Sequence, residues 1–398
     1  MTNRDLFHAT MRRENGENLL HVIQGFDVVL SDWQAQGLPP ELALPPFWGL
    51  SPAPDLFDQS NTCKFAYVGW EQFYVPAFDE ELLEETATRV TRRNSRGNTA
   101  QIRTDGGASL PHEIDFAIKG PDDYARLRER LVGQVSGRVE SQVLADAASA
   151  LRRQQDHLVS LWVHGPFGYL RELLGVEQAI LLPYTEPNLT QQILDDHLQA
   201  SMACAESIIA DTRPDLSYVW EDCCGSSGPM VSPPAFRRFY LPWYQAWKGF
   251  LREHGVPWVV MDTDGDPTPL VGLWIEAGVD CILPWEVNSV DMLAAAEMYP
   301  DLVFMGGIYK HMFEPDAPEQ VGRFPSDDVQ QAIEAELARV VAPMQRRGGY
   351  IPSLDHWVYR AVHYPDFAFY CRLLESEYGV ANQSTRFAVP PCTNQLGV

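Results

Sequence analysis

The chain has 398 residues and a formal net charge of −24, with 45% hydrophobic and 11% aromatic residues. This acidic balance argues against nucleic acids and anionic membranes as partners, because both attract basic surfaces. No run of about 18 uncharged apolar residues occurs, so we expect no transmembrane helix, and the first residues lack the apolar region of a secretory signal. The seven cysteines form no C-x-x-C pair, which is typical of reduced thiols and favours a cytoplasmic protein.

The first third of the chain predicts irregular and antiparallel structure. Residues 19–26 form a candidate first strand, and a short helix ends at the proline-rich turn near residue 39. Residues 65–74 and 88–104 have strand-like patterns, with turns at 94–97 and 105–107. Helices are expected from Pro121 and over residues 143–155.

From residue 157 onward, strands and helices alternate regularly. The expected strands are 157–165, 215–220, 256–261, 281–286, 302–307 and 349–356. The expected helices occupy the region up to residue 212, then 232–253, 269–277, 290–298, 327–344 and 365–377. This alternation demands parallel strands joined by helical crossovers. No G-x-G-x-x-G motif lies between a predicted strand and the helix that follows it. The sequence therefore lacks the phosphate-binding loop of a dinucleotide-binding fold.

With one or two strands from the first third, the count reaches that of a (β/α)8 TIM barrel. No Gly/Ser/Pro linker interrupts the alternating part. We therefore interpret residues 1–398 as a single barrel domain. In this interpretation residues 1–110 form an irregular and antiparallel N-terminal extension, and residues 111–398 form the main barrel.

The stretch that suggests a functional site is the apolar strand 256–261, which stops at Asp262, Asp264 and Asp266. Asp262 and Asp264 share a face if the strand continues through them. Two converging carboxylates cost free energy unless a cation, a shared proton or hydrogen-bond donors compensate. The alternative is an exposed acidic turn that caps the next helix.

Ionisable residues recur at the carboxyl ends of the other predicted strands, where barrels place their active sites. The full set is His164, Glu221, Asp222, Asp262, Asp264, Glu286, Lys310, His311, Asp355 and His356. Each has a structural explanation taken alone, as a hydrogen-bonded histidine, a helix cap or a solvated charge. Together they predict a pocket in which crowded carboxylates act as general acid or base. Alternatively, Asp262, Asp264, Asp355 and His356 hold a divalent ion such as Zn, Mn or Fe.

Several segments, in order, resemble the uroporphyrinogen decarboxylase superfamily, which also contains zinc- and corrinoid-dependent methyltransferases. The resemblance covers roughly residues 110 to 380 and implies a (β/α)8 barrel with its site at the carboxyl end of the strands. The segments that carry it are His164-Gly165-Pro166-Phe167-Gly168-Tyr169-Leu170-Arg171, Leu174-Gly175-Val176-Glu177, Glu221-Asp222 with Ser232-Pro233, Asp262-Thr263-Asp264-Gly265, Leu283-Pro284-Trp285-Glu286, Met305-Gly306-Gly307-Ile308-Tyr309-Lys310, and Gly348-Gly349-Tyr350-Ile351-Pro352 with Asp355-His356.

At several positions this chain departs from the motifs of both the decarboxylase and the thiol methyltransferases. The decarboxylase carries an N-terminal R-Q-A-G-R motif for its substrate carboxylates, whereas Arg12 and Arg13 are followed here by Glu14. The thiol methyltransferases carry His-x-Cys-Gly where this chain has a D-x-D-G sequence ending at Gly265, and a further Cys near Asp355. Hard carboxylates therefore replace the soft ligands of the zinc site.

The function that the resemblance favours is a methyltransferase that moves a methyl group from a small O- or N-methylated substrate to a corrinoid protein. Its cofactors would be a divalent metal, Zn or similar, and the partner's corrinoid. The alternatives are a metal-independent decarboxylase of a porphyrinogen or smaller acid, which needs no cofactor, and a non-catalytic binding barrel. A homodimer is the candidate assembly. We expect catalytic roles for His164, Glu221, Asp262, Asp264 and His356, and substrate contacts from Asp222, Glu286, Lys310 and Tyr350.

Overall fold

In the computed structural model of this chain, the main sheet has seven parallel strands. The structure describes residues 2–22, 30–38, 64–104, 111–139, 157–287, 290–313, 329–356 and 362–379, together with residues 149 and 358. The strands pair in the order β1 (Lys64–Val68), β6 (His157–His164), β7 (Leu216–Trp220), β10 (Trp258–Asp262), β11 (Cys281–Trp285), β12 (Val303–Ile308) and β13 (Tyr350–Leu354). All six neighbouring pairs are parallel.

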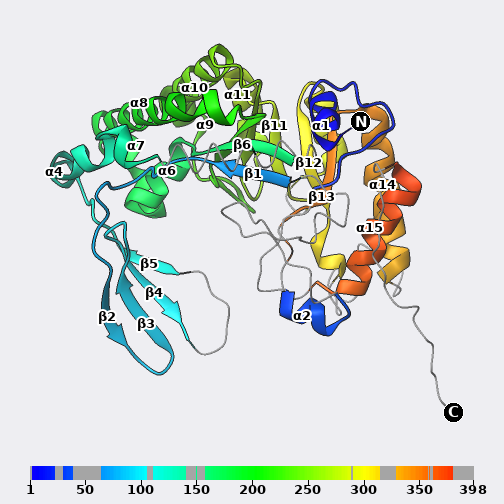
Figure 1. Cartoon of the computed structure of the whole chain (residues 1–398), viewed down its shortest axis with the longest axis horizontal. Helices are drawn as coiled ribbons and strands as arrows, with labels where there is room; N and C mark the ends of the chain where they lie inside the picture. Colours follow the sequence, from blue (N-terminus) through cyan, green and yellow to red (C-terminus); the bar gives the residue numbers. More distant parts are fainter. Residues whose placement is uncertain are drawn as a thin grey trace.

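Helices connect these strands and cover one face of the sheet. Those between β6 and β10 are α6 (Pro166–Leu174), α7 (Val176–Thr185), α8 (Pro187–Thr212), α9 (Pro233–Ala235), η3 (Phe236–Tyr240) and α10 (Leu241–Glu253). The later ones are α11 (Thr268–Ala277), α12 (Met292–Met298), η4 (Lys310–Phe313), α14 (Val329–Arg347) and α15 (Tyr364–Tyr378). In Figure 1, α8, α10 and α11 lie along one side of the sheet, and α14 and α15 lie at the other end.

The predicted alternation of strands and helices from residue 157 onward is confirmed. The alternation could be predicted because the helix boundaries carry local signals. Helix α6 begins at Pro166, and α11 is followed directly by Gly278, whose φ of 90° suits glycine. In the first third, the strand predicted over 65–74 is shorter and ends at Val68. The strand predicted over 19–26 lies partly outside the described residues, as do the turn at 105–107 and all but one residue of the helix predicted over 143–155.

The two faces of the sheet carry two separate hydrophobic cores. One core packs the sheet against the helices and includes Val219 and Met261. The other, which we call the inner core, includes Tyr218 and Val260 on the opposite face. The inner core is covered by α1 (Asn3–Met11), which contributes Leu6, Phe7 and Met11, and by Leu20 and Val22. Because successive strand residues point to opposite faces, each strand of the main sheet from β6 onward contributes to both cores.

A second, four-stranded antiparallel sheet lies apart from the main one. Its order is β2 (Glu81–Glu85), β3 (Arg89–Arg93), β4 (Thr99–Arg103) and β5 (His112–Asp115). Figure 1 shows it projecting below α6. It matches the predicted antiparallel extension, although β5 lies beyond residue 110 and β1 of the same N-terminal part belongs to the main sheet.

The edges of the main sheet, β1 and β13, do not pair with each other within the described residues. The backbone N–H of Val22 donates to the carbonyl of Pro352 on β13 at 3.5 Å. The structure thus establishes a mixed α/β fold with a parallel sheet, as the sequence predicted. Closure of this sheet into a (β/α)8 barrel stays a prediction. Within the described part of the chain, no helix is long and apolar enough to cross a membrane.

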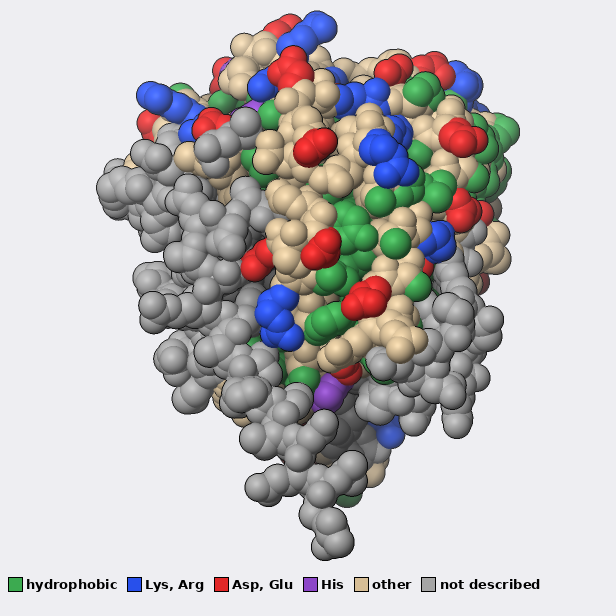
Figure 2. Space-filling view, turned by 90° about the vertical axis from the view of Figure 1, so that its right-hand side faces the viewer, with side chains coloured by type: hydrophobic (Ala, Val, Ile, Leu, Met, Phe, Trp, Pro, Cys, Tyr) green, Lys and Arg blue, Asp and Glu red, His purple; other side chains and the backbone are tan. Residues whose placement is uncertain are grey.

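Surface charge is mixed on the face formed by the C-terminal part of the chain. In the described area of that face, acidic and basic side chains are interspersed among apolar ones (Figure 2). The formal charge of −24 is therefore not gathered there into one acidic surface.

Helix α1 is fastened to the sheet by the buried carboxylate of Asp215. Its side chain accepts hydrogen bonds from Arg4 Nε at 2.7 Å, His8 Nε2 at 3.1 Å and the Val159 N–H at 2.9 Å. The indole N–H of Trp258 donates to His8 Nδ1, which leaves Nε2 as the protonated nitrogen that faces Asp215. Burial alone would raise the pKa of Asp215, but the hydrogen bonds from His8, Val159 and Arg4 outweigh it and lower the pKa.

We predict that Asp215→Asn lowers the free energy of unfolding by about 1–3 kcal/mol at neutral pH, because charged hydrogen bonds are lost. A lowered folded-state pKa contributes stability above the unfolded pKa and loses it as pH falls through the folded value. The difference from wild type should therefore shrink below about pH 4. Urea unfolding at several pH values measures both effects. Asp211→Asn, an exposed charge on α8, is the matched control, and equal effects of the two variants would contradict the prediction.

Candidate functional site

Five carboxylates converge at the carboxyl end of the parallel strands. This acid cluster consists of Asp222 after β7, Asp262 at the end of β10, Asp264 in the following turn, Glu286 after β11 and Asp355 after β13. Each of these groups raises the pKa of another member or has its own pKa raised by one. The predicted convergence of strand-end acids is thus observed for residues drawn from four strands.

Asp262 is a buried acid on the side of the sheet that faces the inner core, with 8% of its surface exposed. The hydroxyl of Tyr218 donates to its Oδ2 at 2.5 Å. Burial raises the pKa of Asp262 well above its usual value; the Tyr218 hydrogen bond opposes this, and Asp264 and Asp222 add to the rise. The crowding of acids therefore favours a proton on Asp262.

Asp264, Glu286 and His356 form the best-placed set of metal ligands in the described residues. One ligand atom from each lies within 4.8 Å of the other two, and His356 Nε2 is 3.5 Å from Asp264 Oδ2. Burial raises the pKa of Glu286, Asp264 raises it further, and His356 opposes the rise. Two carboxylates and one imidazole fit a divalent cation that accepts O and N ligands, and no thiolate belongs to the set.

This set differs in part from the predicted one. Asp264 and His356 belong to both, whereas Glu286, predicted to contact substrate, takes the third place. Asp262 is bonded to Tyr218. The carboxylate of Asp355 accepts the backbone N–H groups of Lys310 at 2.9 Å and Val287 at 3.4 Å, so it orders the surrounding loops.

Asp222 is held by Arg171 of α6. The Arg171 guanidinium donates to the Asp222 carboxylate and, at 3.0 Å, to its carbonyl oxygen. It also lies 5.2 Å from the centre of the Trp220 ring. Asp222 itself has a φ of 42°, a left-handed conformation that is uncommon for a residue other than glycine. Burial raises the pKa of Asp222, and Arg171 opposes this rise.

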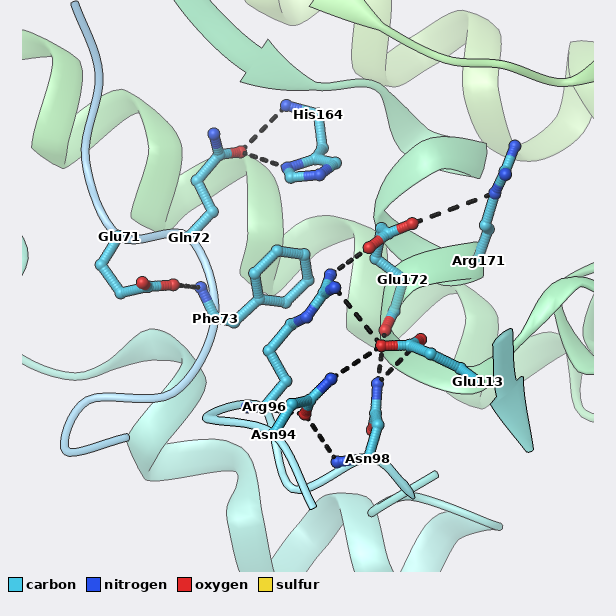
Figure 3. A network of polar contacts seen from close by, with 10 residues as sticks. All are labelled: Glu71, Gln72, Phe73, Asn94, Arg96, Asn98, Glu113, His164, Arg171 and Glu172. Atoms are coloured by element: carbon cyan, nitrogen blue, oxygen red, sulfur yellow. Dashed lines mark hydrogen bonds and ion pairs between the residues drawn. The ribbon is translucent and has the colours of Figure 1, made fainter. Parts of the chain in front are cut away.

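His164, predicted to be catalytic, is buried among aromatic rings next to the cluster. Gln72 Oε1 accepts its backbone N–H at 2.9 Å and lies 3.3 Å from its Nδ1 (Figure 3). An amide oxygen accepts, so Nδ1 carries the proton and Nε2 is left as an acceptor. Burial lowers the pKa of His164 well below its usual value, and the charges of His197 and Arg96 lower it further. His164 is thus held in the neutral form, in which it is a weak base and its Nε2 can accept a hydrogen bond.

Figure 3 shows how the antiparallel sheet reaches this region. Arg96, in the turn between β3 and β4, pairs with Glu172 of α6 and with Glu113 of β5, the latter at 3.4 Å. Its guanidinium also lies 5.2 Å from the centre of the Phe73 ring, and that ring contacts His164 edge-on at 5.0 Å. The antiparallel sheet is therefore connected to α6 and, through the Phe73 ring, to His164.

Glu221 points to the opposite face of the sheet from Asp262. Its Oε2 accepts the Gly168 N–H at 3.0 Å at the start of α6, and its Oε1 accepts the Tyr244 hydroxyl at 3.0 Å. A side chain at Gly165 would approach Glu221 Oε2 to 2.3 Å, which explains glycine there. Burial raises the pKa of Glu221 to about 8. The structure therefore gives Glu221 a role in holding α6 and does not bring it into the acid cluster.

Two predicted substrate-binding residues remain: Lys310 lies near the acid cluster, and Tyr350 lies far from it. Lys310 begins η4 and lowers the pKa of Glu286 and Asp355, so it lies beside the cluster. Tyr350 is the first residue of β13 and belongs to the helix-facing core, where its hydroxyl donates to the Gly306 carbonyl at 3.0 Å. The structure does not bring Tyr350 to the acid cluster.

Sequence reasoning gave no role to Tyr218, Trp220 or Gln72. The first two could have been found, because counting back by twos from Asp222 on β7 selects the residues that share its face. Gln72 lies in a loop with no local signal, and only the tertiary structure places it against His164.

The comparisons with known proteins bear on the fold. No family model and no curated protein matches the chain. A solved methyltransferase from Methanosarcina mazei superposes with a TM-score of 0.57, covering 94% of this chain and 99% of that one. The two chains share a fold. At 13% sequence identity, this similarity is evidence for the fold alone. The chemistry must be inferred from the residues of the site.

We predict that Glu221→Gln becomes more stable relative to wild type as pH rises from about 5 to about 8. The Glu221 pKa rises from 4.5 to about 8 on folding, so the folded wild type binds an extra proton in this window and loses stability as pH increases. Glutamine does not titrate. Urea unfolding at both pH values tests this, with exposed Glu206→Gln on α8 as the control. A constant difference between Glu221→Gln and wild type across the window would contradict it.

Proposed function

We propose that this chain is a methyltransferase that moves a methyl group from a small O- or N-methylated substrate to a corrinoid carried by a partner protein. The observation that carries the proposal is the buried Asp262, which faces Asp222 and Asp264 at the carboxyl end of a parallel sheet. A carboxyl whose pKa is raised in this way holds its proton to a higher pH than a free aspartate does, and it can give the proton to a departing nitrogen or oxygen. The shared fold with a methyltransferase supports this direction.

In the proposed reaction, a reduced corrinoid on the partner would supply the nucleophile, and the electron pair of the C–O or C–N bond would leave on the oxygen or nitrogen. Asp262 shares its proton with the departing atom, so that an alkoxide or amide anion does not form. Tyr218 fixes the Asp262 carboxyl through its 2.5 Å hydrogen bond, and Arg171 balances the charge of Asp222.

The chain offers no competing nucleophile in this region among the described residues. Cys223 and Cys224 are both buried, with their Sγ atoms 3.8 Å apart. Burial raises the pKa of Cys223 well above its usual value, which keeps it as an unreactive thiol. Direct transfer to an external acceptor is consistent with this arrangement.

We also propose that Asp264, Glu286 and His356 hold a divalent cation, with Zn the leading candidate. When bound, such an ion supplies Lewis acidity to the oxygen or nitrogen of the substrate. The ligands come from three different loops, so cation binding would also fix those loops relative to one another.

The sheet is proposed to close into a (β/α)8 barrel within a single domain of residues 1–398. The support is the inner core, which the strands surround on one face and α1 covers at one end. A flat open sheet would need a layer of helices on this face as well.

The test is methyl transfer from a panel of methyl ethers and methylamines to a reduced corrinoid protein. We expect Asp262→Asn to lower the transfer rate roughly 100-fold or more, the usual contribution of a general acid. Asp195→Asn, exposed on α8, should leave the rate unchanged. Absence of methylcorrinoid with every donor would overturn the proposal.

The alternative is a decarboxylase, since a proton on Asp262 also suits the quenching of a carbanion and Lys310 lies nearby. Release of CO2 from a small organic acid without corrinoid or metal would favour it. Full activity of the Asp262→Asn and Asp264→Asn variants in either assay would instead show that these carboxyl groups are not the site. No activity of the wild type in both assays would favour a non-catalytic binding protein.

A separate prediction concerns the metal. Protein purified without chelator should contain about one divalent cation per chain by elemental analysis. His356→Gln and Glu286→Gln should lose it, because each removes one of three ligands. His363→Gln, a half-exposed histidine paired with Asp366, should retain it. Equal metal contents in all three variants would refute the assignment.

A further inference from the structure

Two tryptophans lie on the inner face of the sheet next to the acid cluster. Trp162 on β6 and Trp220 on β7 are half-buried and pack on the inner core. The His164 ring contacts both of them edge-on, with centroid distances of 4.5 Å and 5.2 Å. The mechanism proposed above gives these rings no role.

Carboxylates border the Trp220 ring on the side away from His164. In the strand pairing, Trp220 is opposite His164 on one side and opposite Asp262 on the other. Paired residues on neighbouring strands are about 5 Å apart. Asp222 follows Trp220 by two residues, and Asp264 interacts with both Asp222 and Asp262. An aromatic face is thus joined directly to a concentration of negative charge.

One cation of the protein already uses this combination. The Arg171 guanidinium lies 5.2 Å from the centre of the Trp220 ring and pairs with the Asp222 carboxylate. Aromatic faces attract cations through the ring quadrupole, most strongly when the cation has lost water. His164 adds no competing positive charge, because burial holds it in the neutral form.

We propose that Trp162, Trp220 and the carboxyl groups of Asp222 and Asp262 bind the methylated ammonium group of the substrate. The inference rests on the proposed methyltransferase function and narrows its substrates to two kinds of methylated nitrogen compound. Methylamines would receive the Asp262 proton on nitrogen, whereas quaternary methylammonium compounds leave as neutral amines and need no proton. A quaternary nitrogen has no N–H, so hydrogen bonds alone cannot recognise it; aromatic faces together with carboxylates can. The carboxylates would also orient the methyl groups of a protonated methylamine through its N–H.

The experiment measures binding without corrinoid, so its outcome is independent of methyl transfer. Choline, tetramethylammonium and 3,3-dimethylbutan-1-ol, the neutral isostere of choline, are titrated into the full chain. We expect both cations to bind and the isostere to bind at least 10-fold more weakly. Equal binding of choline and its isostere, or no binding of any probe at millimolar concentration, would overturn the proposal.

Variants then test the rings. Trp220→Leu should weaken choline binding roughly 2- to 30-fold, Trp162→Leu should weaken it in the same direction, and Trp220→Phe should weaken it less than Trp220→Leu. Trp258→Leu is the matched control, since Trp258 packs on the same inner core at the opposite end of β10, beside His8. An equal loss in Trp258→Leu would mean a general effect on the fold and would overturn the assignment. Methyl transfer that fails while choline still binds would count against the proposed function alone.

Discussion

The burial of the Asp262 carboxyl at the end of β10 is the constraint on which the candidate site depends. An unpaired buried carboxylate costs several kcal/mol, and the structure offsets this cost with one hydrogen bond from Tyr218 and a raised pKa. The backbone carbonyl of Asp262 also accepts the N–H groups of Glu221 and Asp222, at 2.9 Å and 3.1 Å. The ends of β7 and β10 are therefore tied together at the position of the acid.

The turn that follows Asp262 is fixed just as firmly. Gly265 has a φ of 72°, and a side chain there would approach the Gly225 backbone to 2.4 Å. The Asp266 N–H donates to the Gly225 carbonyl at 2.9 Å. Glycine is thus required for two reasons, backbone conformation and close packing. This turn sets the direction in which Asp264 approaches Glu286 and His356.

Much of this arrangement could be read from local sequence signals. Apolar runs ending in charged residues marked the strands from β6 to β13, and the parallel sheet followed from their alternation with helices. The face that each side chain occupies was harder to predict. Glu221 and Asp222 are neighbours, yet Glu221 holds α6 and only Asp222 reaches the acid cluster. A shift of one residue in register exchanges the two, and local sequence does not set that register.

The identity of the third metal ligand illustrates another limit. Asp355 precedes His356 in the sequence, so it was the natural candidate, but its carboxylate binds two backbone N–H groups. Glu286 takes its place from a different strand. Contacts between residues 70 positions apart depend on the curvature of the sheet, which hydrophobic periodicity does not specify. The same holds for Gln72, whose contact with His164 spans 92 positions.

The alternation of faces along β7 has an evolutionary consequence. Tyr218 and Trp220 face the inner core and the acids, whereas Val219 between them packs against helices. Selection on chemistry and selection on folding therefore act on alternate residues of one strand. New substrates could be explored at the inward positions while the outward positions preserve the scaffold. A saturation library across residues 216–222 should show tolerance that changes with every second position, with the outward positions limited by volume and the inward ones by charge and aromaticity.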